Sequence, residues 1–198
     1  MSTKRLRNQV RSLLLDGDLE GVADLATEKK QVLGSLIALT FDPELRVVWR
    51  AIEAMGLGVE RLSSSQPAYL KEHMRRLFWL ITEEAGAVFW RAPECMAECA
   101  FRAPDLFQSH IPIAYHLLET LEEEDLEHFR PGTLWAIGRL NPLAEKYLPD
   151  VLPLVVEALD RPDAQSRGLA VWCLGEVGEA GILESRPQLL EDPGTVHL

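Results

Sequence analysis

The residues best suited to chemistry in this chain are three cysteines, at positions 95, 99 and 173. Cys95 and Cys99 are four residues apart, so on a helix their thiols share one face and would supply two ligands to a metal ion. A tetrahedral site needs two more ligands, and three cysteines are too few and too odd in number for a disulfide framework. The simplest interpretation is that all three are small core residues. We therefore predict no metal site.

The spacing of these cysteines belongs to a longer pattern, a segment of about eight residues that occurs four times. In each copy a small residue is followed by a long aliphatic one, and another apolar residue stands three positions further on; the small residues are Ala51, Cys95, Ala136 and Cys173. The steps between them are 44, 41 and 37 residues. A recurrence of about 40 residues is typical of helical solenoids, in which each repeat packs on its neighbours. We expect these four residues to be buried between helices, with Cys173 about 20 Å from Cys95 at roughly 10 Å per helix layer.

Helix signals surround each copy of the segment. Asp42-Pro43-Glu44 places an acid at an N-cap and a proline at the first helical position, and Gly56-Leu57-Gly58 is expected to end that helix. An inner helix is predicted from about Tyr69 to Thr82, with Leu70, Met74, Leu77, Phe78 and Ile81 on its buried side. The next two inner helices align with each other from Ile111 and Leu152, each with a proline in second place.

These signals predict one all-α domain over residues 1–198, an α-solenoid (α/α superhelix) of about four to five helix pairs. Capping helices occupy residues 1–41 (4–15, 19–26 and 31–39), and the repeats cover 42–83, 87–121, 129–159 and 163–190. Pro93 stands where the second repeat should be in mid-helix, so that outer helix is kinked or begins late. Residues 182–190 are expected to form a short final helix, followed by a frayed tail at 191–194. No segment alternates as a strand would.

Two of the copies resemble a known family. Residues 42–56 and 160–178 are similar to HEAT repeats of the short type that also occurs in phycobilisome lyases: each opens on an Asp and a Pro, has an Arg a few residues on and closes with small and apolar residues before a glycine. The resemblance covers roughly residues 30 to 185. It implies a right-handed stack of HEAT-like helix pairs and leaves the activity open.

Several activities known from HEAT-type proteins fit this chain poorly. Hydroxylases that bind two irons carry His-Glu dipeptides at matching repeat positions, whereas this chain has Glu72-His73 and Glu127-His128, reversed and out of register. HEAT-like glycosylases need a basic surface, but 31 acidic and 20 basic residues give this chain a net charge of −11, which repels a phosphate backbone. It has no Gly-rich phosphate loop and no nucleophile elbow.

The function that we expect is a non-enzymatic scaffold or adaptor that holds a protein partner on its concave face, without catalytic residues or cofactor. The alternative is an accessory enzyme or cofactor-handling protein of the phycobilin-lyase type, and behind it a HEAT-like nucleic-acid glycosylase. The partner face should lie opposite the buried side of the inner helices. Its candidate residues are Glu72, Arg75, Arg76, Trp79, His116, Glu119 and Glu157.

Trp79 carries most of this expectation, because an exposed tryptophan beside arginines has the composition of interface hot spots. Packing of Trp79 against the next repeat is the alternative. Trp135 and Trp172 share one repeat position and are expected to pack between repeats. With no signal-peptide pattern and no apolar run of membrane-spanning length, we expect a cytoplasmic protein with an unidentified protein partner, and no nucleic-acid or membrane binding. The sequence sets no oligomeric state.

Overall fold

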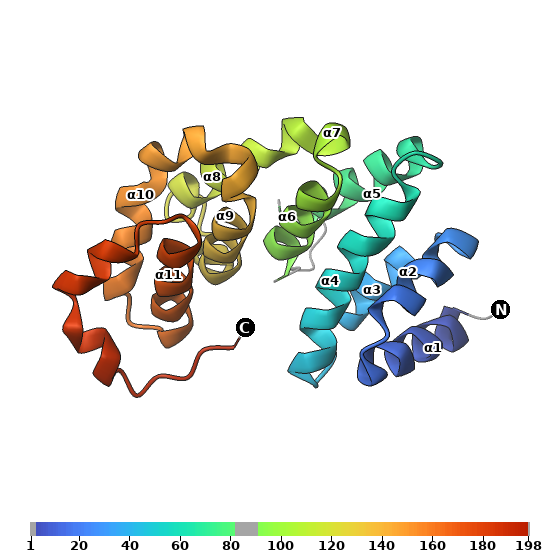
Figure 1. The fold of residues 1–198 in the computed structure, drawn as a ribbon, viewed down its shortest axis with the longest axis horizontal. Helices are drawn as coiled ribbons and strands as arrows, with labels where there is room; N and C mark the ends of the chain where they lie inside the picture. Colours follow the sequence, from blue (N-terminus) through green and yellow to red (C-terminus); the bar gives the residue numbers. More distant parts are fainter. Residues whose placement is uncertain (1–2, 82–90, 198) are drawn as a thin grey trace. The chain divides into compact units, whose positions relative to one another are not determined.

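The computed structural model describes residues 3–81 and 91–197, and all regular structure in these ranges is helical (Figure 1). The predicted all-α fold of packed helix pairs is confirmed. The chain divides into two compact units, Met1–Val88 with Glu98–Gln108, and Phe89–Ala97 with Ser109–Leu198. None of the helices in the described ranges combines the length and the apolar character that a membrane span requires.

Five helices make up most of the first unit as far as the structure describes it. They are α1 (Thr3–Asp16), α2 (Leu19–Glu28), α3 (Val32–Leu39), α4 (Leu45–Leu62) and α5 (Pro67–Trp79), and the short α7 (Pro104–Phe107) packs against α5. α2 packs along α4, α1 packs on α3, and α3 also contacts α4. The three helices predicted ahead of the first repeat are therefore confirmed. Thr82, where the α5 helix was expected to end, lies outside the described residues.

The start of α4 differs from the prediction. The helix begins at Leu45, with Glu44 in the N-cap position, so Asp42 is not the cap. The Asp42 carboxylate instead accepts the Glu44 backbone N–H at 3.1 Å and a two-pronged contact from Arg11, at 2.6 and 3.0 Å. Asp42 thus ties the turn before α4 to α1, because a guanidinium matches both carboxylate oxygens.

The end of α4 was also predicted wrongly, because the helix continues through Gly56 and Gly58 to Leu62. A Cβ at Gly56 would stand 2.6 Å from Glu98 Cγ, and one at Gly58 would stand 3.1 Å from a Leu33 methyl group. These glycines therefore permit close approach of neighbouring helices. Their effect is on tertiary packing, which local helix-ending signals do not report.

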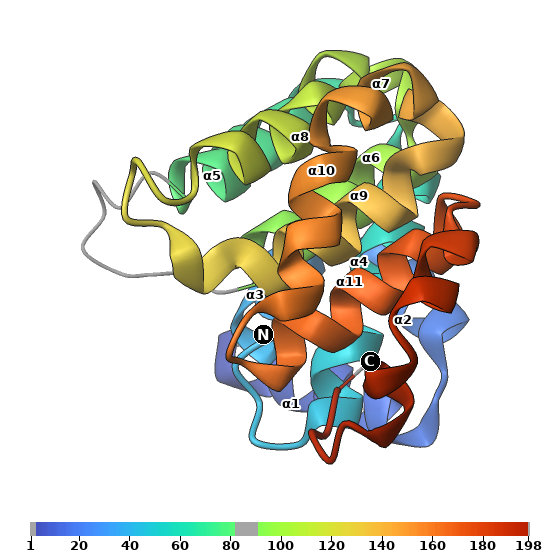
Figure 2. The same ribbon diagram turned by 90° about the vertical axis from the view of Figure 1, so that its left-hand side faces the viewer.

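The second unit has two helical layers. α9 (Arg130–Ala144) packs along α11 (Ala164–Glu176), and α8 (Ile111–Thr120) packs on α9 and on α10 (Leu148–Glu157) (Figure 2). The rings of Trp135 and Trp172 stack with centroids 5.9 Å apart and planes 7° apart, which confirms that they pack between repeats. Gly138 makes room for this stack, since a Cβ there would lie 2.6 Å from Trp172 Cζ3.

The boundary between the units falls within α6 (Ala92–Arg102). Pro93 occupies the second position of this helix, where its missing N–H has no partner to lose. The second outer helix therefore begins late, one of the two outcomes expected. The first residues of the predicted 87–121 repeat lie outside the described residues.

The repeat alignment is confirmed by burial, since the four small residues Ala51, Cys95, Ala136 and Cys173 are all fully buried. The predicted helix near the end of the chain is not confirmed. Residues 182–190 do not form an α-helix but belong to two 3₁₀ segments, Ala180–Ser185 and Pro187–Glu191. Neither segment buries a residue, and Leu190 is 91% exposed, so an apolar face that would stabilise an α-helix is missing here.

Candidate interaction surfaces

The solvent-facing side of α5 combines basic and aromatic side chains. Glu72, Arg75 and Arg76 are exposed, and Trp79 is 48% exposed. Arg75 pairs with Glu72 at 2.6 Å, while Leu70, Met74 and Leu77 face the core. Phe78 was predicted on the buried side and is 39% exposed, because it lies about 100° around the helix from Leu77.

Lys71 and Lys30 extend the basic character of this surface. Lys71 is exposed one turn before Arg75. The Lys30 ammonium lies 4.8 Å from the centre of the Tyr69 ring, and the Tyr69 hydroxyl donates a hydrogen bond to the Lys30 carbonyl at 2.8 Å. We call Lys71, Arg75, Arg76, Phe78 and Trp79 the α5 surface.

His73 lies beneath the α5 surface, on the buried side of the same helix. Its ring stacks on Tyr69 at 6.5 Å, and within the described structure its Nε2 has no hydrogen-bond partner. Burial, aided by the nearby Arg76 guanidinium, lowers the pKa of His73 to about 4. His73 is therefore a neutral core residue at neutral pH.

In the second unit, the predicted residues on α8 and α10 are also exposed. His116 and Glu119 lie one turn apart on α8, with His116 Nδ1 3.3 Å from a Glu119 carboxylate oxygen. Glu157, at the end of α10, lies 3.7 Å from Arg161. The exposure expected for all seven candidates is confirmed, but the α5 group and the α8–α10 group belong to different compact units. Partner binding by either group stays a prediction.

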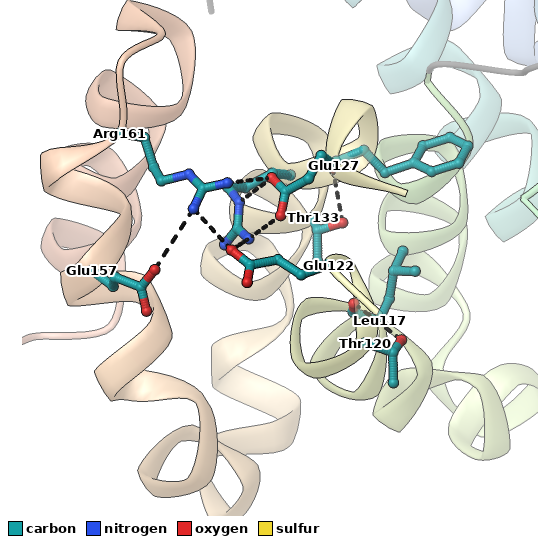
Figure 3. A network of polar contacts seen from close by, with 9 residues as sticks. Leu117, Thr120, Glu122, Glu127, Thr133, Glu157 and Arg161 are labelled. Carbon is teal, nitrogen blue, oxygen red and sulfur yellow. Dashed lines mark hydrogen bonds and ion pairs between the residues drawn. The ribbon is translucent and has the colours of Figure 1, made fainter. Parts of the chain in front are cut away.

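Glu157 belongs to a network of ion pairs centred on Arg161 (Figure 3). The Arg161 guanidinium lies 2.9 Å from Glu122 and 2.8 Å from Glu127. Arg130, which is only 4% exposed, donates to both carboxylate oxygens of Glu127 at 2.8 and 2.5 Å. These contacts, from Arg130 first and then Arg161, lower the pKa of Glu127. The network fastens the acidic connection between α8 and α9 to the turn before α11.

Two buried acids on α6, Glu94 and Glu98, were not identified from the sequence. Arg91 lies 2.8 Å from Glu94, whose burial raises its pKa, and within the described residues Glu94 Oε2 has no hydrogen-bond partner. A Cβ at Gly132 would stand 2.3 Å from that oxygen. A signal existed: Glu94 directly precedes the small repeat position, where two other copies have tryptophans that pack between repeats.

The three cysteines are buried free thiols. Burial raises the pKa of Cys99, and raises that of Cys173 to about 12, so neither is a thiolate nucleophile at neutral pH. In residues 3–81 and 91–197, no group of three or more His, Cys, Asp and Glu is arranged to hold a metal ion.

An open pocket of about 340 Å³ lies in the first unit, between the end of α4 and α7. Its lining includes one cation, Arg102, which contacts Glu98 at 2.9 Å and Glu60 at 3.5 Å. These carboxylates offset the Arg102 charge, so the pocket has little attraction for an anion. The lining residues are Ser63, Ser64, Arg102, Ala103, Pro104, Asp105 and Leu106.

Comparison with known proteins identifies one part of this architecture. Residues 127–177 match the profile of the HEAT-like repeat family. The chain contains a HEAT-like repeat. The matched segment runs from the 3₁₀ turn Glu127–Phe129 through α9 and α10 and past the end of α11 at Glu176. The resemblance to HEAT repeats that the sequence indicated is thereby confirmed.

Among solved structures, the chain is similar to the archaeal HEAT-like repeats protein from Thermococcus onnurineus NA1. The two share 20% sequence identity and superpose with a TM-score of 0.40, over 98% of this chain and 75% of that one. No curated protein sequence matches the chain.

Proposed function

We propose that this HEAT-like chain is a non-enzymatic interaction scaffold, and that the α5 surface holds a protein partner. The supporting observation is the composition of that surface. Three cations, of which Arg75 is paired with Glu72, and two aromatic rings are exposed along about two turns of one helix, in a chain whose net charge is −11. Arginine and tryptophan are the residues that most often carry binding energy at interfaces.

The charge and the aromatic side chains of the α5 surface indicate what kind of partner would bind there. Lys71 and Arg75 lie one turn apart along α5, and Arg76 directly follows Arg75. This row of cations favours an acidic segment that runs along the helix. Phe78 and Trp79 stand at the end of this row and offer apolar area to an aromatic or aliphatic anchor. The partner that fits is an acidic peptide segment with a large apolar residue at one end.

The test is a binding measurement with two double variants. Affinity capture with mass spectrometry first identifies partners, and the affinity of each is then measured by calorimetry for the parent and for Arg75→Ala/Trp79→Ala. If both residues are hot spots, the variant should lose about 2 kcal/mol or more of binding free energy, roughly 30-fold in Kd.

The matched control is Leu45→Ala/Arg46→Ala, which removes one exposed apolar side chain and one exposed arginine from the start of α4. It should bind the partner as the parent does. Circular dichroism must show equal helical signal in all three proteins. A partner that binds Arg75→Ala/Trp79→Ala within twofold of the parent would refute the α5 surface as its binding site.

A further inference from the structure

The segment of residues 192–197 lies in a non-helical conformation (Figures 1 and 2, red) and contacts residues 164–168, at the start of α11. The sequence suggested a frayed tail at 191–194, and that prediction is wrong. Arg167, on α11, donates two hydrogen bonds to the Asp192 carboxylate, from Nε to Oδ2 at 2.6 Å and from Nη2 to Oδ1 at 3.0 Å. The Arg167 pair lowers the pKa of Asp192.

A second anchor holds the far end of the segment through its backbone. The Gln165 side-chain amide donates to the His197 carbonyl at 2.9 Å and accepts the His197 N–H at 3.0 Å. Because both contacts are to main-chain atoms, this anchor accepts any residue at that position that has a backbone N–H. Arg167 and Gln165 together hold the segment at two points five residues apart, one a side-chain carboxylate and the other the backbone.

Between these anchors the surface is shaped by small residues. A Cβ at Gly168 would lie 2.0 Å from Val196 Cγ2, so the Val196 side chain occupies the space that a larger residue on α11 would fill. A Cβ at Gly194 would lie 2.4 Å from the Ala164 Cβ, so the segment needs a glycine there. The α11 face therefore selects a pattern: Asp, two residues later Gly, and two residues later a branched apolar side chain.

The acidic anchor has a counterpart in the first unit. Asp42 is also followed by proline. Its carboxylate accepts two hydrogen bonds from Arg11 at 2.6 and 3.0 Å, the distances of the Arg167–Asp192 pair, and it accepts the backbone N–H of Glu44, two residues further on. At Asp192 the corresponding N–H belongs to Gly194, at 2.8 Å. After Asp42 the chain continues into the helix α4, whereas after Asp192 it stays non-helical at the surface. Pro193, Gly194, Thr195 and His197 are exposed, and Val196 is half-buried.

We propose that this face of α11 is a binding site for an extended peptide with the pattern Asp-Pro-Gly-x-Val, and that residues 192–197 occupy it in cis. The trans occupant is a partner segment with this pattern. A tethered segment competes at an effective concentration on the order of millimolar, so a free peptide binds the parent weakly until the cis segment is displaced.

The test uses a fluorescently labelled peptide, Glu-Asp-Pro-Gly-Thr-Val-His, with blocked ends, and anisotropy as the readout. The variant Asp192→Ala/Val196→Ala weakens the cis segment and leaves α11 unchanged. It should bind the peptide at least about tenfold more tightly than the parent does, because the tethered competitor is lost. Adding Arg167→Ala or Gly168→Ala to this variant should cancel that gain. A peptide with Asn in place of Asp should bind more weakly.

A second measurement does not depend on the peptide. Gly168→Ala in the otherwise unchanged chain keeps α11 helical and removes the space for Val196, so the His197 amide should exchange its hydrogen faster than in the parent.

Three outcomes would overturn the proposal. The first is that Asp192→Ala/Val196→Ala stays folded and binds the peptide no more tightly than the parent. The second is that this variant loses its helical circular dichroism signal, which would make residues 192–197 an integral part of the fold. The third is that the parent is a dimer and Asp192→Ala/Val196→Ala is a monomer. Residues 192–197 would then bind the α11 face of a second copy of this chain.

Discussion

His73 should make the stability of the first unit depend on pH between about 7.5 and 5. The side chain is 6% exposed, and burial, with a smaller contribution from Arg76, lowers its pKa from 6.5 to about 4. At a pH between about 4 and 6.5, His73 is mostly protonated in the unfolded chain and mostly neutral in the folded chain. The stability that comes from a neutral His73 is therefore complete above the unfolded pKa and is lost progressively as pH falls toward the folded pKa.

The size of the effect follows from the two pKa values. At pH 7.5 the unfolded imidazole is almost entirely neutral, so the linkage contribution is close to zero. At pH 5.0 the unfolded state binds the proton with about 30-fold advantage, which corresponds to a loss of about 2 kcal/mol in the free energy of unfolding. That is a large fraction of the stability of a typical domain.

The assay is urea unfolding at pH 7.5, 6.0 and 5.0, for the parent, His73→Leu and His73→Gln. Both variants lack the titrating group, so each should lose about 2 kcal/mol less than the parent does between pH 7.5 and 5.0. The two variants will differ in absolute stability, because leucine and glutamine pack differently, and that difference should not change with pH. If the parent and both variants showed the same pH dependence, the burial of a neutral His73 would be refuted.

Three further measurements test the packing. Gly138→Ala should lower the free energy of unfolding by about 1–3 kcal/mol, because its Cβ would stand 2.6 Å from the stacked Trp172 ring. The matched change Gly175→Ala, on α11, should raise the free energy of unfolding by about 0.5–1 kcal/mol, since beyond its own stretch of helix that Cβ would meet no atom of the described structure within 4 Å. Urea curves that shift in the same direction for both variants would contradict this packing. The native thiols should react with Ellman's reagent no faster than the protein unfolds, and rapid labelling of any one would show that it is accessible; they are Cys95, Cys99 and Cys173.

The sequence determined the helical class and the repeat positions, because both depend on the local spacing of apolar residues. Ala136 and Cys173 were expected to be buried on that basis alone, and they are. The stacking of Trp135 on Trp172 followed from their shared repeat position. The exposure of Arg75 and of the other candidate residues followed from the same periodicity, since the face of a helix opposite its apolar stripe lies in solvent.

Tertiary structure decided what local signals could not express. Gly56 reads as the end of a helix, yet α4 continues because Glu98, 42 residues away, packs against it. Residues 192–194 read as a frayed tail, yet Arg167, 25 residues earlier, holds Asp192. In both places the deciding partner is remote in sequence. Helix periodicity indicates which face of an element is buried, but the identity of the atoms that meet that face depends on how the chain brings distant segments together.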